Sequence, residues 1–279
     1  MFNILRMDLY RLIRSKSVYI CLAFLMIMSF LCFWLIWMLD TPEGRTMAAK
    51  IGISLIEIEN DGFSVTAAAP AAEGEILQGY DILAMFREIG MDGGAYTCIL
   101  GIVVSIFVCH DYNCGFIKNI LSQHRKRWKY IGSKLITAGI LNLFYLTLSF
   151  GFCLLLNAVF SGLVPMVDVG SILFYLGLSW LLTTAFAALF ILIITLSRST
   201  SAGILSSILL GSGIVVTVLI TLTKYWGLEK WADYTLYINQ TYAPSCYSGI
   251  ADLKGFAVGA AFLLLYSAAS FIVLNRKDI

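Results

Sequence analysis

The sequence is short of charge. Only 13% of its 279 residues are Asp, Glu, Lys or Arg, whereas 59% are hydrophobic. A soluble globular domain has about 25% charged residues, so this chain lacks the polar surface that such a domain needs. The shortage is concentrated, because six long stretches contain no Asp, Glu, Lys, Arg or His. This distribution indicates a protein that lies within a lipid bilayer.

The six uncharged stretches predict an all-α integral membrane protein with six transmembrane helices, forming one domain over residues 1–279. A helix needs about 20 apolar residues to cross the hydrocarbon core. The second stretch is the shortest, and we expect it to begin near Ile89 and to run through the Gly93–Gly94 pair. The predicted spans are about 18–39, 90–109, 135–160, 171–196, 203–222 and 255–274, with an outer loop at 40–89.

Basic residues are scarce on one side of this predicted topology. The two termini and the loops at 110–134 and 197–202 hold 13 of the 19 Lys and Arg residues and have a net charge of +10. The segments on the other side have a net charge of −8. Lys and Arg near span ends are retained in the cytoplasm. We therefore expect a multi-pass protein with both termini cytoplasmic.

Several kinds of chemistry lack the residues they need. Asp, Glu, Lys, Arg and His are absent from the six uncharged stretches, which argues against a proton- or ion-coupled transporter. There is no HExxH motif and no GxxxxGK[ST] phosphate loop, so neither a metalloprotease nor ATP binding of that kind is predicted. Cys109, His110, Cys114 and His124 lie near one another in sequence, but their irregular spacing does not predict a metal site. A loop of this length cannot form a nucleic-acid-binding domain.

The first segment, residues 2–14, has helical periodicity. Its basic residues, and Asp8 with them, fall mostly away from the apolar face. This pattern predicts an amphipathic helix in the membrane interface, although a plain basic flank of the first span remains an alternative. The apolar face consists of Phe2, Leu5, Leu9, Leu12 and Ile13.

The outer segments are acidic or aromatic. Within residues 40–94, the alternation at 51–60 predicts a strand and the segment 80–90 a short amphipathic helix. The acidity of this loop would attract cationic solutes, or it reflects only the scarcity of basic residues outside. The loop at 223–254 contains two Trp and five Tyr, so we expect it to lie against the bilayer, with short re-entrant helices as one form.

Small residues recur every fourth position in the fifth span, at Gly203, Ser207 and Gly211. Such spacing lets helices approach closely. The partner helix is either in the same chain or in a second copy, and the pattern does not decide between them.

The loop at 110–134 carries a more specific pattern: an acid, then G-x-I-K, then Leu, Arg and finally S-K. It resembles the loop between the second and third spans in permease subunits of bacterial type-2 ABC exporters. The basic amino-terminal helix, the large first outer loop and the closing NRKDI extend this resemblance over nearly the whole chain. The QHRKR run departs from the usual pattern. The matching residues are Asp111, Gly115, Ile117, Lys118, Leu121, Arg127 and Lys134.

The resemblance implies a short cytoplasmic coupling helix that docks in a groove of a separate ABC ATPase. ATP and Mg²⁺ would be bound by that partner, and this chain would hold no cofactor and catalyse no reaction. The implied coupling residues are Gly115, Phe116, Ile117, Lys118, Ile120, Leu121 and Arg127. A second copy or a sister permease would complete the membrane part, and Thr97, Ser105, Ser212 and Thr217 would line a cavity on the second and fifth spans.

The resemblance therefore implies ATP-driven export of an amphipathic peptide, lipid or drug across the bacterial cytoplasmic membrane. Two other classes remain open from the residues alone. One is a membrane immunity protein that sequesters a peptide without ATP. The other is a membrane enzyme, for which the spans offer no acid, base or metal group.

Overall fold

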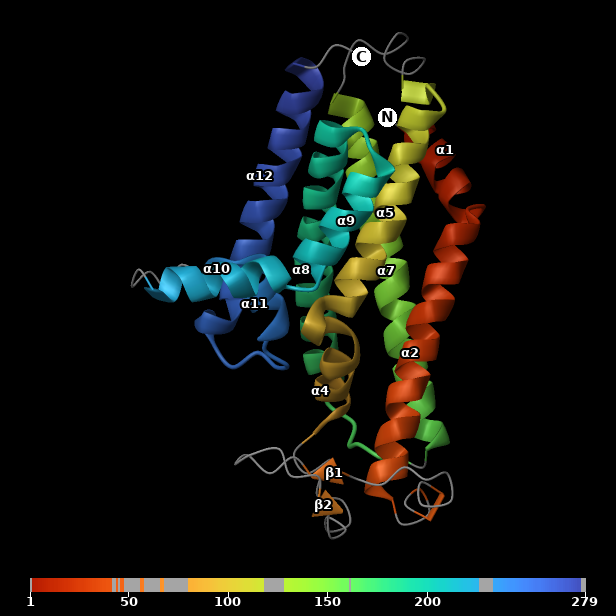
Figure 1. Cartoon of the computed structure of the whole chain (residues 1–279), viewed down its shortest axis with the longest axis vertical. Helices are drawn as coiled ribbons and strands as arrows, with labels where there is room; N and C mark the ends of the chain where they lie inside the picture. Colours follow the sequence, from red (N-terminus) through yellow and green to blue (C-terminus); the bar gives the residue numbers. More distant parts are fainter. Residues whose placement is uncertain are drawn as a thin grey trace.

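The computed structural model shows a bundle of long helices with both termini at the same end (Figure 1), called here the terminal end. The chain is described at residues 2–41, 44, 46–47, 56–57, 66–67, 80–117, 128–160, 162–225 and 233–276. An amino-terminal helix, α1 (Phe2–Ile13), precedes the bundle. Four long helices cover the predicted first, third, fourth and sixth spans: α2 (Lys16–Asp40), α7 (Trp128–Val159), α8 (Val169–Ser197) and α12 (Lys254–Arg276).

The second predicted span begins with three short helical segments that precede its long helix. A short helix, α4 (Ile82–Phe86), is capped by Asp81, whose carboxylate accepts the Ala84 N–H at 2.6 Å. A π turn (η1, Arg87–Met91) and a 3₁₀ turn (η2, Asp92–Gly94) lead into α5 (Ala95–Asn113). Gly93 and Gly94 both have left-handed φ angles near +68°, which glycine adopts without strain. The segment predicted to be helical is thus helical, but its apolar side chains are buried in the core.

The predicted fifth span is not one straight helix, so a single crossing of the membrane at this position stays a prediction. α9 (Thr200–Gly211) and α10 (Ile214–Tyr225) meet at an angle of 55°. Ser212 ends α9, and Gly213 turns the chain with a φ of +75° while the Tyr237 ring packs against it. α10 consequently lies across the bundle (Figure 1). Five helical segments of the described chain are long and apolar enough to cross a membrane, and the bent pair makes a sixth if it counts as one span.

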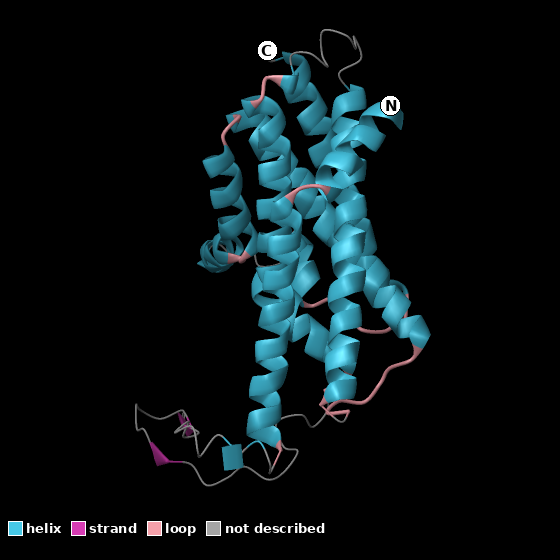
Figure 2. Cartoon of the chain, turned by 90° about the vertical axis from the view of Figure 1, so that its right-hand side faces the viewer, coloured by secondary structure: helices cyan, strands magenta, loops and turns pink. Residues whose placement is uncertain are grey.

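The remaining elements are short. Two residues of the predicted strand, β1 (Ile56–Glu57), pair antiparallel with β2 (Thr66–Ala67), so that Ile56 lies opposite Ala67. After α10, the outer segment contains α11 (Leu236–Thr241) and the 3₁₀ turn η4 (Ile250–Leu253). Figure 2 shows the long helices running side by side in the orthogonal view.

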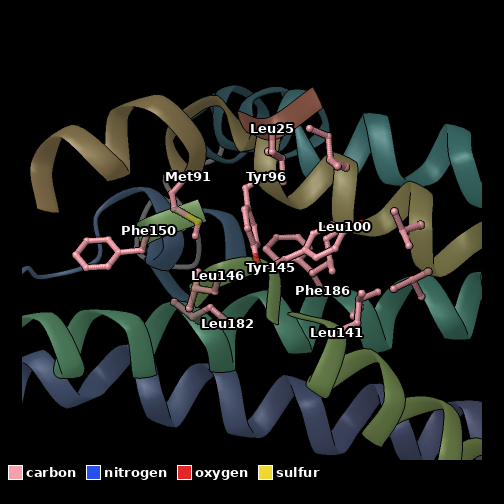
Figure 3. Close-up of a cluster of buried hydrophobic side chains, with 14 of the residues drawn as sticks. Leu25, Met91, Tyr96, Leu100, Leu141, Tyr145, Leu146, Phe150, Leu182 and Phe186 are labelled. Carbon is pink, nitrogen blue, oxygen red and sulfur yellow. The ribbon is translucent and has the colours of Figure 1, made fainter. Parts of the chain in front are cut away.

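α8 is the central helix, because it packs against α5, α7, α9, α11 and α12. Large side chains of α8 interdigitate with those of α5 and α7. They include Phe186 of α8, Tyr96 of α5 and Tyr145 of α7 (Figure 3). The Phe86 and Phe150 rings meet edge to face with centroids 5.4 Å apart, an arrangement that aromatic pairs favour. α4 is thereby attached to α7.

A buried amide joins three of these helices. Asn142 on α7 donates from Nδ2 to the Thr183 and Thr184 hydroxyls of α8, at 2.7 and 2.9 Å. Its Oδ1 accepts a hydrogen bond from the Tyr96 hydroxyl of α5 at 2.9 Å. Interhelical hydrogen bonds of this kind contribute about 0.6–2 kcal/mol each in a membrane. They also fix the relative rotation of α5, α7 and α8.

The small residues of α9 pack against α5 of the same chain. A Cβ added to Gly203 would lie 2.8 Å from Ser105 Oγ, and one added to Gly211 would lie 2.9 Å from Cys98 Sγ. On the facing side, a Cβ on Gly101 would lie 2.5 Å from the Ser207 Cβ. The sequence left open whether the partner helix belongs to the same chain or to a second copy. In the structure, these small residues contact a helix of the same chain.

This close approach generates a prediction for Gly101→Ala. The added methyl group would meet both Ser207 and the Phe190 ring, so we expect a loss of about 1–3 kcal/mol, typical of overpacking. The matched control is Gly151→Ala on α7, where the methyl group would enter open space. There the higher helix propensity of alanine should leave stability unchanged or raise it by up to ~1 kcal/mol. Thermal unfolding of the two variants in detergent measures the difference, and equal melting temperatures would contradict the α5–α9 contact.

Candidate functional site

Three helices meet at the terminal end of the bundle and bring together four charged side chains. Asp8 and Arg11 come from α1, Asp111 from the end of α5, and Lys134 from the start of α7. We call these four residues the ion cluster. Two cations face two anions, so the ion cluster is neutral as a whole.

Lys134 lies at its centre. Its Nζ is 2.8 Å from Asp8 Oδ1 and 2.6 Å from Asp111 Oδ2. The exposed fractions of the three side chains are 1% for Lys134 and 0% for each carboxylate. Arg11, which is 25% exposed, places Nη1 2.8 Å from Asp111 Oδ1, in contact but without the alignment of a hydrogen bond. The arrangement is therefore a buried chain of alternating charges.

Neighbouring groups add further contacts to the ion cluster. Ser133 donates from Oγ to Asp8 Oδ2 at 2.8 Å, and Tyr130 donates from its hydroxyl to Asp111 Oδ2 at 3.2 Å. The Lys134 ammonium also lies 4.3 Å from the centroid of the Phe107 ring, within the range of a cation–π contact. Such additional partners are needed for buried charges to recover their desolvation cost.

Asp8 was expected on the polar face of α1, and the structure corrects this. Ile4, Asp8 and Leu12 are spaced four residues apart and form the buried stripe of the helix. An acid in the middle of an apolar stripe is the sequence signal that identifies a buried carboxylate. The identity of its partner, Lys134, cannot be read from the sequence, because 126 residues separate the two.

The loop predicted to dock an ATPase begins directly beside the ion cluster. Gly115 turns the chain after α5 with a φ of +65°, and the Arg11 guanidinium lies 5.0 Å from the centroid of the half-buried Phe116 ring. Ile117 is buried within the protein, where it packs with Tyr130, Ile131 and Leu274. Lys118, Ile120, Leu121 and Arg127 lie outside the described residues.

Two residues of the sequence pattern meet in space. Asp111, the acid that opens the pattern, is the ion partner of Lys134, which closes it. The base of the loop is therefore held together by a buried salt bridge, and the ends of α5 and α7 are linked there.

The four residues expected to line a cavity lie in different surroundings, and the cavity itself stays a prediction. Thr97 is fully buried and exchanges hydrogen bonds with Gln240 of α11, at 2.7 Å from Gln240 Nε2. Ser105 is fully buried against Gly203. Ser212 stands at the bend, and the Thr217 hydroxyl donates to the Gly213 carbonyl at 3.0 Å. Thr97 and Ser105 thus connect helices of one chain, and Gln240 is a partner that sequence reasoning missed.

The geometry predicts a large effect for Lys134→Met. Removing the ammonium leaves two buried carboxylates, Asp8 and Asp111, and a single remaining cation, Arg11, which contacts only Asp111. Breaking a buried ion pair in this way costs about 3–5 kcal/mol of stability. We expect the melting temperature in detergent to fall by on the order of 10 °C. Lys129→Met, on the same helix and outside the ion cluster, is the control and should melt within about 2 °C of the unmodified protein. A small shift for both variants would show that Lys134 is not held as described.

The comparisons with known proteins identify the family of this chain. A family model described as "ABC-2 family transporter protein" matches residues 81–235, which are 155 of the 279 residues and include α5, the loop and α7 to α10. No curated protein matched the sequence. On the strength of this match, together with its apolar spanning helices, the chain belongs to the ABC-2 family of transporter permeases, which are membrane components of transport systems and not themselves catalytic.

Proposed function

We propose that this chain is the transmembrane subunit of an ATP-driven exporter in a bacterial cytoplasmic membrane. It works with a separate ABC ATPase, and both of its termini are cytoplasmic. The charge bias of the sequence supports this orientation, since the termini and the loop at 110–134 belong to the basic side. The observation that carries the proposal is the ion cluster, which ties that loop to α1, α5 and α7.

The ion cluster gives the loop a rigid base. A force that the ATPase applies between residues 115 and 127 reaches the Asp111–Lys134 pair, with its N–O distance of 2.6 Å. Separating that pair would leave charges unpaired in a buried site, which is unfavourable by several kcal/mol. The loop therefore moves α5 and α7 together, and α1 follows through Asp8.

Deeper contacts carry this motion across the protein. α5 is packed against α9 at Gly101, Gly203 and Gly211, which we call the glycine seam. α5 is also hydrogen-bonded to α11 through Thr97 and Gln240. α7 is bonded to α8 through Asn142. The bend at Gly213 is where one part of the protein can change its angle relative to the rest. We propose that ATP binding in the partner tilts this unit and opens a path between two permease copies.

The second copy would meet an apolar surface on α9 and α10. Large apolar side chains are exposed there, including Leu205, Leu209 and Val218. The bent pair has no charged residue between Thr200 and Leu222, so a path beside it would suit an amphipathic substrate such as a peptide, lipid or drug.

Docking of the ATPase is tested by the double variant Phe116→Asp/Ile120→Asp. Two carboxylates on the apolar side of the coupling segment should abolish co-purification with the ATPase, because apolar anchors carry helix-in-groove binding. Met166→Asp is the control, since Met166 is an exposed apolar residue that follows the outer end of α7, away from the coupling segment. Retained co-purification and unchanged transport in the double variant would contradict the coupling assignment. Protection of cells by the permease alone would instead favour sequestration without ATP.

A second experiment separates coupling from stability. Asp8→Asn/Lys134→Met removes one charge of each sign and leaves Arg11 paired with Asp111. We expect this double variant to melt several degrees above Lys134→Met alone, because no carboxylate is left uncompensated. Transport per ATP hydrolysed in proteoliposomes should nevertheless fall about tenfold, since α1 and α7 are no longer linked. Normal coupling in a protein without this link would show that the ion cluster is structural only.

A further inference from the structure

A pocket of about 390 Å³ lies beside the ion cluster, in the elbow between α1 and α2 where both face α5. We call it the elbow pocket. Its polar wall consists of Arg11, Arg14, Ser15, Ser17 and His110, and its apolar wall includes Ile106 and Phe107. No Asp or Glu lines it. The volume falls within the range of about 300–1,000 Å³ that is usual for small-molecule sites.

The elbow pocket carries unbalanced positive charge. Arg11 is neutralised within the ion cluster, where it contacts Asp111. Arg14 donates to the Tyr10 hydroxyl at 3.2 Å, and no carboxylate of the described residues pairs with it. Its guanidinium is therefore available to an anion, and the planar fork of an arginine suits the oxygens of a phosphate.

The beginning of α2 adds backbone donors to the same pocket. α2 is 25 residues long, and its N-cap residue Ser15 makes no side-chain capping bond. The first N–H groups of a helix lack partners within the helix, and its dipole favours an anion at this end. Ser15 and Ser17, at the beginning of α2, both line the pocket, and their side chains are hydroxyls. Guanidinium, hydroxyl and helix-terminal N–H groups together form a phosphate-binding environment.

The surroundings place this environment at the edge of the membrane. Tyr10 and Tyr19 on either side of the elbow are 64% and 51% exposed, and tyrosine is enriched at the membrane–water interface. Ile106 and Phe107 belong to the apolar part of α5. On the other side of the elbow, an apolar groove of about 310 Å³ lies between α1, α2 and α7, lined by Leu9, Leu12, Ile140 and Phe144 among others. Both headgroup and acyl-chain chemistry therefore meet at the elbow.

We propose that the elbow pocket binds the phosphate of an anionic phospholipid headgroup. The lipid would thereby act on the ion cluster, because Arg11 lines the pocket and contacts Asp111 through the same guanidinium. A bound phosphate shares Arg11 with Asp111 and draws α1 toward the start of α2. Binding involves only residues of this chain, so it holds or fails independently of the ATPase.

The test uses the purified full-length chain in detergent with phosphatidylglycerol, and phosphatidylcholine as the zwitterionic comparison. Native mass spectrometry measures how much of each lipid is retained. We expect Arg14→Gln to weaken phosphatidylglycerol binding roughly tenfold, the effect of losing one charge-assisted hydrogen bond. Arg6→Gln is the matched control, because Arg6 is an exposed arginine of the same helix outside the elbow pocket, and its binding should match that of the unmodified protein.

A second variant protects the test against misfolding. Ser17→Asp places a carboxylate in the first turn of α2, where it stabilises the helix but occupies the position of the phosphate. This variant should melt no lower than the unmodified protein and still lose phosphatidylglycerol. Equal lipid retention by Arg14→Gln, Ser17→Asp and Arg6→Gln would overturn the proposal. Displacement of phosphatidylglycerol by millimolar inorganic phosphate or glycerol 3-phosphate would overturn the lipid as the occupant, whereas resistance to both supports it.

Discussion

One ammonium group between two carboxylates constrains the terminal end of this permease. Lys134 on α7 cannot leave Asp8 on α1 or Asp111 on α5 without exposing a charge to a poorly polar environment. Replacing the three residues by well-packed apolar ones could give a similar or greater stability, so stability alone does not account for them. What the charges add is a fixed geometry, because the three helix ends have few arrangements in which every charge keeps its partner.

Deeper in the bundle, hydrogen bonds between neutral side chains impose a similar constraint. Asn142 binds two threonines of α8 and the tyrosine of α5, and Gln240 binds Thr97. Each amide would be expensive to leave unpaired in hydrocarbon, so these contacts also favour one arrangement of helices. The glycine seam between α5 and α9 acts through shape instead of polarity. Together the three sets of contacts hold these helices in one arrangement, and α10 leaves that arrangement at the bend at Gly213.

The sequence predicts the long helices well, because a bilayer excludes charge and the long uncharged stretches are easy to identify. It does not reveal the bend in the fifth span, since Ser212 and Gly213 are as compatible with a continuous span as with a break. Periodicity along α1 identifies its faces, yet Asp8 was assigned to the wrong one, because only a partner far along the chain makes its burial favourable. The same reason hides the bond between Thr97 and Gln240, which are 143 residues apart.

Charged and neutral polar side chains are buried in different parts of the molecule. The buried charged side chains of the described residues lie at the terminal end, where α1, α5 and α7 meet. The buried polar side chains deeper in the described helices, such as Asn142, Thr183 and Gln240, are neutral. In the proposed exporter, a substrate moving along such helices would find no fixed charge to bind. The direction of transport would then be set by the force that the proposed ATPase applies at the terminal end, where the charges are. The elbow pocket lies at that same end, so the proposed lipid and the proposed partner would act on one set of side chains.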